Sequence, residues 1–245
     1  MNNILKIGTS FLLGVGAGLM IRNKDWHNFI TSYIPALATL VAAYYGAKFA
    51  FEFQNQKELE IEKKNNLIAI NKAIFTLSRM ANDLFVYQRD YINLVRDEKE
   101  AFLKLRPTSQ YDKELFKLDI ESLSFLLNTD FRNLLSEIAI EGERYIAAIE
   151  AINLRSNIHL NEIQPKLENA GFKNGLSITI SDADLELILG NRLLSMLKET
   201  TEQVITHVDS TIESLKLVAD RLKDSMKTIY PDQKIITFNL PKSSK

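Results

Sequence analysis

Two long apolar runs stand near the start of the chain, ahead of a region of regularly spaced hydrophobic residues. The longer run covers residues 26–47 and contains no Asp, Glu, Lys or Arg. A helix needs about 20 apolar residues to cross the hydrocarbon core of a bilayer, so this run predicts a transmembrane helix. Trp26, Tyr44 and Tyr45 lie near its ends, where amphipathic aromatic rings favour the headgroup layer. Pro35 predicts either a kink or the effective start of the helix.

The shorter run, residues 7–21, is brief for a membrane span unless Lys6 and Arg22 extend outward to the headgroups. Three interpretations are open. The two runs form a transmembrane hairpin, residues 26–47 form a single span, or the first run is a signal peptide cleaved near Ala17. We follow the hairpin, because the second run begins only a few residues after the first and would remain as an anchor even after cleavage.

The distribution of basic residues predicts the orientation of this hairpin, because Lys and Arg near helix ends are retained in the cytoplasm. The loop between the runs carries only Arg22 and Lys24. The basic residues on the other side are Lys6, Lys48, Lys57, Lys63 and Lys64. We therefore predict a multi-pass protein of the bacterial inner membrane with both termini in the cytoplasm.

Small residues recur at four-residue intervals in both apolar runs. The first run holds Gly14 and Gly18, and the second holds Ala38, Ala42 and Gly46. This spacing places small side chains on one face of a helix and lets two backbones approach closely. The face can pack the hairpin against itself, drive self-association, or have no packing role. These five residues are the candidate site residues, for helix packing within the membrane.

Beyond residue 52 the hydrophobic residues follow alternating three- and four-residue steps, which is typical of helices that pack along one apolar seam. The first such helix is predicted over residues 65–104 and ends before Pro107. Its seam consists of Leu67, Ile70, Ile74, Leu77, Ala81, Leu84, Gln88, Tyr91 and Val95. A shorter helix is predicted over residues 112–127.

A second long helix is predicted to start at Thr129 or Asp130, whose side chains can accept hydrogen bonds from free amides. It runs towards Ala170, where Gly171 is a C-cap, and Pro165 predicts a kink or an early end. Its seam consists of Ile138, Tyr145, Ile149, Ile152, His159 and Ile163.

After a predicted loop, a last long helix begins at Ser181 or Asp182 and ends before Tyr230 and Pro231. Its seam consists of Ile212, Leu215, Ala219, Leu222, Met226 and Ile229. Residues 235–238 are expected to form a short extended tail.

Together these patterns predict an all-α protein with a membrane anchor at residues 1–52. A bundle of long antiparallel amphipathic helices is expected at residues 53–230, followed by a C-terminal tail at residues 231–245.

Charge and composition narrow the function. Residues 51–245 contain 26 basic and 30 acidic residues, and an acidic domain is not typical of direct nucleic-acid binding. The chain has no cysteine, which excludes disulfides and thiolate chemistry.

Recognisable catalytic motifs are missing from the sequence. His27, His159 and His207 are far apart and form no metal-ligand pair, and no glycine-rich phosphate loop, GxSxG elbow or dinucleotide fingerprint occurs. We expect no metal, no cofactor and no enzymatic activity. His159 falls on an apolar seam, so we expect a hydrogen-bonded core residue or a partly exposed one rather than a general base.

Several stretches resemble, as a set, a group of bacterial membrane-anchored helical proteins over about residues 40–230. These stretches are GAKFAFEFQNQKELE, SLSFLL, INLRSNIHLNEIQPKLE and HVDSTIESLKLVADRLKDSM. The order of two spans and a cytoplasmic helical domain also looks like the two-transmembrane effector encoded with some retrons, beside a reverse transcriptase and its noncoding RNA. The likeness is architectural and carries no family residue over.

This resemblance implies an abortive anti-phage function, in which the effector is held inactive until infection and then perturbs the inner membrane. The lipid bilayer, further copies of the chain, and the neighbouring reverse transcriptase complex are then the expected partners. A membrane-tethered scaffold that recruits a cytosolic partner without toxicity is the alternative, and a membrane-bound enzyme would require a pocket assembled from distant residues.

Overall fold

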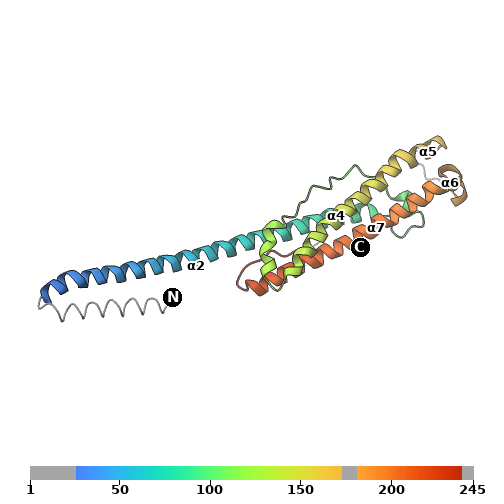
Figure 1. Cartoon of the computed structure of the whole chain (residues 1–245). Helices are drawn as coiled ribbons and strands as arrows, with labels where there is room; N and C mark the ends of the chain where they lie inside the picture. Colours follow the sequence, from blue (N-terminus) through green and yellow to red (C-terminus); the bar gives the residue numbers. More distant parts are fainter. Residues whose placement is uncertain (1–25, 173–180, 239–245) are drawn as a thin grey trace. The chain divides into compact units, whose positions relative to one another are not determined.

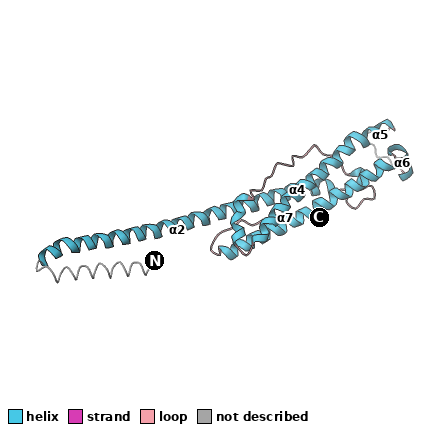
Figure 2. Ribbon diagram, viewed as in Figure 1, coloured by secondary structure: helices cyan, strands magenta, loops and turns pink. Residues whose placement is uncertain are grey.

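The computed structural model describes residues 26–172 and 181–238, and every regular element in these ranges is a helix (Figure 2). The predicted all-α class is confirmed. The helices in chain order are α2 (Trp26–Tyr87), α3 (Ala101–Lys104), α4 (Arg132–Ile158), α5 (Gln164–Asn169), α6 (Asp182–Leu189) and α7 (Asn191–Ile229), with π-turns η1 (Gln88–Ile92) and η3 (His159–Ile163) and the 3-10 helix η2 (Glu121–Asn128). The predicted span at residues 7–21, with Gly14 and Gly18, lies outside the described residues.

The chain divides into two compact units, Met1–Lys63 and Lys64–Lys245. We call the second the helical unit. In the first unit, α2 begins at Trp26, so Pro35 lies inside the helix and does not mark its start. The Thr39 hydroxyl donates to the Pro35 carbonyl at 2.8 Å, one turn back along the helix.

In the helical unit, α7 runs antiparallel both to α4 and to the last turns of α2, and α4 and α7 lie side by side (Figure 1). Hydrogen-bonded pairs establish that the helices are antiparallel, because residues near the end of α4 or α2 bond to residues near the start of α7, and earlier residues bond to later ones. Those pairs are Arg155 with Thr201, Glu141 with Ser214, Glu137 with Arg221, Gln88 with Asp209, and Asn66 with Tyr230. Consequently, α2 and α4 run parallel, and the chain between them must return along the unit.

The core between these three helices is built by the predicted seams. Ile70, Ile74 and Leu77 of α2 are fully buried, as are Leu215 and Leu222 of α7. They belong to one continuous cluster that also contains Ile138, Tyr145, Ile149 and Ile152 of α4. Burial of each large aliphatic side chain contributes about 1.5–3 kcal/mol, so this cluster is the main source of stability.

The returning segment corrects one prediction. Residues 112–127 do not form one α-helix, because residues 106–120 are irregular and only the 3-10 helix η2 follows. Phe116, Leu118 and Ile120 pack against the core, whereas the residues between them are exposed. Alternate residues face the core in an extended chain, so this stretch follows a period of two, which the helical interpretation overlooked.

The first predicted helix also ends earlier than residue 104. The i to i+4 pattern of α2 stops at Tyr87 and gives way to η1, where the Asn93 amide donates to the Gln88 carbonyl at 2.8 Å. Asp209 of α7 fixes this turn. Its carboxylate accepts from Gln88 Nε2 at 2.7 Å and from both terminal nitrogens of Arg96 at 2.6 and 2.8 Å. The tertiary contact thus replaces the last turns of the expected helix.

Replacing Asp209 with Ala is expected to destabilise the helical unit by about 1–2 kcal/mol, because a bidentate, partly buried ion pair and a side-chain hydrogen bond are lost together. Hydrogen exchange of the full chain measures the change, and the amides of residues 88–96 should lose protection most. Asp224→Ala, on an exposed position of the same helix, is the matched control. Equal exchange in the two variants would contradict the role of Asp209.

The two ends of α5 follow the chemistry of glycine and proline. The predicted terminator Gly171 directly follows the C-cap residue Ala170 of α5: it has a φ of +92°, its amide donates to the Glu168 carbonyl, and the Phe172 amide donates to the Leu167 carbonyl. Pro165 lies in the first turn of α5, directly after η3, so the i to i+4 pattern of the long helix is interrupted by a π-turn there and resumes to Asn169.

One of the two predicted helix starts differs from the prediction. α4 begins at Arg132, and Thr129 bonds to the Phe131 amide at 3.1 Å, just ahead of the helix. Ser181 caps α6 as predicted, through its hydroxyl and the Asp184 amide. The last long helix is not continuous, because Gly190 adopts a φ of +79° between α6 and α7, a conformation that glycine reaches without steric cost.

Candidate functional site

The part of α2 that lies in the first unit carries large apolar side chains that nothing in the described chain covers. An 18-residue window near the N-terminus has a mean hydropathy of 1.3, and none of it is buried. Leu40, Phe51 and Phe53 are 59%, 71% and 70% exposed. A helix that is apolar on all sides requires an apolar environment. The described residues therefore contain one candidate membrane-spanning helix.

Three of the predicted site residues lie on this helix. Ala38, Ala42 and Gly46 are exposed and share one face, since they are four residues apart. A Cβ placed on Gly46 would meet no atom within 4 Å. The face is thus open to a partner of any kind, and Gly14 and Gly18, the other two site residues, lie outside the described ranges.

The helical unit buries a cation that no carboxylate of the described residues neutralises. Arg155 is fully buried on the seam of α4. Its Nη2 donates to the Phe102 carbonyl at 3.0 Å, its Nε lies 3.4 Å from the Thr201 hydroxyl, and its Nη1 has no partner among the described residues. Burial lowers the pKa of Arg155 to about 10, which reflects the cost of removing a charge from water.

Two other buried polar groups adjoin this arginine. Burial raises the pKa of Tyr87 to about 12, and its hydroxyl is unpartnered within the described ranges. Burial, together with the charge of Arg155, lowers the pKa of His159 to about 4 despite a hydrogen bond to the Leu103 carbonyl. His159 is therefore the hydrogen-bonded, partly buried residue that its seam position predicts, and it is neutral at pH 7.

Sequence reasoning missed Arg155, although a signal was present. The seam of α4 steps from Ile152 to His159, and the position between them must be filled by residue 155 or 156 to keep three- and four-residue steps. Both face inward, since Ser156 is also buried, and the Thr108 amide donates to its hydroxyl at 3.2 Å.

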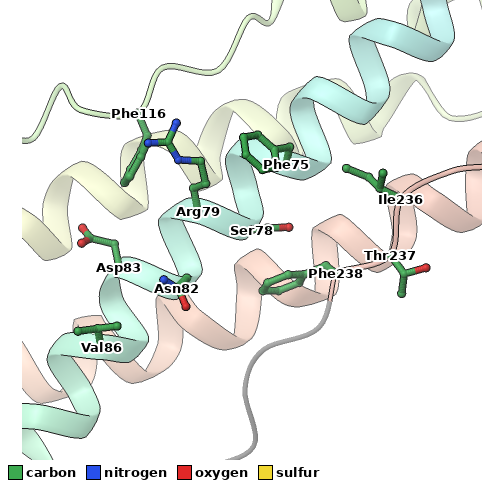
Figure 3. A pocket seen from close by; sticks show the side chains of 10 residues that line it. All are labelled: Phe75, Ser78, Arg79, Asn82, Asp83, Val86, Phe116, Ile236, Thr237 and Phe238. Atoms are coloured by element: carbon green, nitrogen blue, oxygen red, sulfur yellow. The ribbon is translucent and has the colours of Figure 1, made fainter.

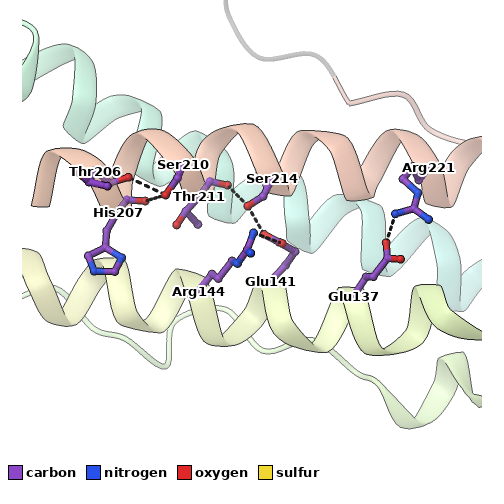
Figure 4. A network of polar contacts seen from close by, with 9 residues as sticks. All are labelled: Glu137, Glu141, Arg144, Thr206, His207, Ser210, Thr211, Ser214 and Arg221. Atoms are coloured by element: carbon purple, nitrogen blue, oxygen red, sulfur yellow. Dashed lines mark hydrogen bonds and ion pairs between the residues drawn. The ribbon is translucent and has the colours of Figure 1, made fainter. Parts of the chain in front are cut away.

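A second polar cluster joins α4 to α7 along their contact (Figure 4). Glu141 is 3% exposed, and its carboxylate accepts from the Ser214 hydroxyl at 2.6 Å and from Arg144 at 3.2 Å. One turn earlier, Glu137 pairs with Arg221. Both carboxylates are occupied by these partners, so the cluster fixes the register of the two helices and presents no free base.

An open groove of about 630 Å³ lies along α2, between the returning segment and the C-terminal tail (Figure 3). The Arg79 guanidinium lies 4.4 Å above the Phe116 ring, a cation–π contact. Asp83 accepts from the Tyr145 hydroxyl at 2.7 Å, and Phe238 of the tail is buried against the core. The lining residues are thus engaged in structural contacts, and none pairs a nucleophile with a base.

The histidines do not converge. His159 lies at the start of η3, His207 is exposed on α7, and His27 belongs to the first turn of α2. Within residues 26–172 and 181–238, no three His, Asp or Glu side chains form a group that could hold a metal ion.

Comparison with protein-family models, with characterised proteins and with solved structures finds no match to this chain. Any functional assignment therefore rests on the residues themselves.

Proposed function

We propose that this protein is a membrane-anchored effector that perturbs the bacterial inner membrane and ends phage infection by killing the host cell. The observation that carries the proposal is the uncovered apolar stretch of α2, of which no residue in its most apolar window is buried. In water such a surface costs about 25 cal/mol for each Å² that stays exposed. A bilayer removes that cost.

In this proposal the segment is one of two spans, both termini are cytoplasmic, and the helical unit is a cytosolic bundle that receives inhibition before infection. The basic residues at the helix ends support the orientation. The effector acts when several copies associate through the small-residue face of Ala38, Ala42 and Gly46, where close backbone contact replaces contact with lipid. A neighbouring reverse transcriptase with its noncoding RNA would supply the inhibition.

Inducible expression in bacteria tests the proposal through entry of an impermeant DNA-binding dye. We expect wild-type chains to admit the dye, and Leu substitutions at Ala38, Ala42 and Gly46 together to reduce the dye-positive fraction severalfold, because bulky side chains hold the backbones apart. The control is the same substitution at Ala36, Ala43 and Ala47, whose side chains centre about 120° around the helix from the small-residue face. It should retain dye entry.

Expression without any loss of membrane integrity, both alone and with the flanking genes, would refute the effector function. A static scaffold is then the remaining candidate, and it makes a separate prediction: an unrelated transmembrane helix should replace residues 1–47 without loss of function.

A further inference from the structure

Five aromatic side chains surround α2 just where the sequence places the end of the span. We call them the aromatic collar: Tyr44, Tyr45, Phe49, Phe51 and Phe53. The three phenylalanines are the most exposed of the set, at 64%, 71% and 70%. The ring centroids of Tyr44 and Tyr45 are 5.5 Å apart, and those of Tyr45 and Phe49 are 6.3 Å apart. The Tyr45 ring thus lies close to both Tyr44 and Phe49, and Phe51 and Phe53 extend the collar further along the helix.

The collar faces more than one direction. At 3.6 residues per turn, Tyr45, Phe49 and Phe53 project from one side of the helix, and Tyr44 and Phe51 project from about the opposite side. A protein partner that docks on a helix covers one face. The headgroup layer of a bilayer surrounds the helix, and it is the environment that aromatic side chains favour. The arrangement of the five rings therefore favours a surrounding lipid environment over the binding groove of a protein partner.

The charged side chains among residues 48–53 do not prevent this segment from entering the bilayer. Lys48 and Glu52 are four residues apart on one face, with their charged atoms 3.7 Å from each other. A paired cation and anion have no net charge and cost less to bring near lipid than a lone charge. The first lysine without a paired carboxylate in the described first unit is Lys57, beyond the collar.

The opposite end of the helix supports the same register. Residues 26–33 include His27, Asn28, Thr31 and Ser32, whereas the polar side chains of residues 34–47 are only Thr39, Tyr44 and Tyr45. Residues 34–53 at 1.5 Å per residue span about 30 Å, the thickness of a hydrocarbon core.

From these observations we infer that the membrane-embedded part of α2 is residues 34–53, with the aromatic collar in the half that ends at Phe53 and its last rings at the headgroup layer. This inference rests on the proposed insertion into a bilayer and deepens it. It moves the boundary from Ala47, the end of the uncharged run, to Phe53, so that residues 26–33 lie in the opposite headgroup layer.

The chain has no cysteine, so single-cysteine variants of the full chain report the boundary directly. In spheroplasts and in inverted membrane vesicles, a membrane-impermeant maleimide should label Asn55→Cys from the cytoplasmic side and leave Ala50→Cys and Ala42→Cys unlabelled. Each variant is labelled again in SDS, which shows that its thiol can react. Ala50 decides the matter, because it lies in water if the span ends at Ala47.

The outcomes separate this inference from the proposed function. Labelling of Ala50→Cys and Asn55→Cys with protection of Ala42→Cys would overturn the boundary and leave membrane insertion intact. Labelling of all three would overturn both. Protection of all three would place the boundary beyond the collar and also contradict the inference.

The collar itself is tested in the Ala50→Cys background. Replacing Phe49, Phe51 and Phe53 with Ser should expose the thiol at position 50 to the maleimide, because the boundary then retreats towards Ala47. Replacing Leu59 and Ile61 with Ser, outside the collar, is the control and should leave position 50 protected. Continued protection in the triple variant would show that the phenylalanines do not set the boundary.

Discussion

The helical unit is expected to lose roughly 2 kcal/mol of stability when the pH falls from 7 to 4.5, and His159 is the cause. Burial, together with Arg155, holds the pKa of this histidine at about 4 in the folded chain, against about 6.5 when unfolded. Between these two pH values His159 is protonated in the unfolded state and neutral in the folded state. The free energy of unfolding therefore falls as the pH drops from 6.5 towards 4. For a fully buried ring, this difference in pKa would correspond to a loss of roughly 3 kcal/mol. The ring of His159 is partly exposed, so solvent screening reduces the loss.

Hydrogen exchange of α4 and α7 in the full chain measures this dependence between pH 7 and 4.5, after correction for the intrinsic exchange rate. His159→Gln should remove most of the pH dependence, because the amide cannot titrate. His207→Gln is the control on an exposed face of α7 and should behave as wild type. A His159→Gln variant with an unchanged pH profile would show that another group controls acid stability in this range.

The helical class and the buried seams could be predicted because their signal is local. A period of 3.6 residues selects Ile70, Ile74 and Leu77 in α2 and Leu215 and Leu222 in α7 without reference to any other part of the chain, and all five are fully buried. The termination of α5 at Gly171 and the cap of α6 at Ser181 follow from short-range chemistry as well. Local rules also place Ala38, Ala42 and Gly46 on one face.

The features of the fold that could not be predicted depend on contacts between residues far apart in sequence. The end of α2 at Tyr87 is determined by Asp209, more than a hundred residues away, which binds Gln88 and Arg96. No local pattern contains that contact. The parallel direction of α2 and α4 has the same origin, and it requires the extended return that was predicted as a helix over residues 112–127. In that segment the helical propensity of individual residues was outweighed by alternate burial of Phe116, Leu118 and Ile120.

The residues of the candidate site show the same distinction between local and long-range signals. Sequence predicts the apolar stretch and its small-residue face, because both are properties of a single helix. Arg155 belongs to the other class, because its surroundings come from α3 and α7 as well as from its own helix. A charged residue at a seam position is a warning sign in a sequence, but whether a carboxylate meets it is decided only by the tertiary fold.

Replacing Arg155 with Ala is expected to destabilise the helical unit by about 3–5 kcal/mol. The substitution leaves a cavity in a closely packed core and removes the donor from the partly buried Phe102 carbonyl. Arg155→Met should cost at least about 2 kcal/mol less, because its side chain fills most of the space that Ala leaves empty. Both substitutions remove the buried, unneutralised charge, a relief of roughly 3 kcal/mol from a pKa held at about 10 against an ordinary 12.5, so the cavity and not the charge separates the two variants.

Chemical denaturation of the full chain in detergent, followed by tyrosine fluorescence, compares the two variants. Arg132→Ala, at the exposed start of α4, is the control and should change the stability by less than about 0.5 kcal/mol. If Arg155→Met is as damaging as Arg155→Ala, the hydrogen bonds of the guanidinium outweigh its desolvation, and the cation stabilises the fold. If Met restores stability, the buried charge is a cost that the fold carries, because the two hydrogen bonds that Arg155 makes are too weak to offset its removal from water.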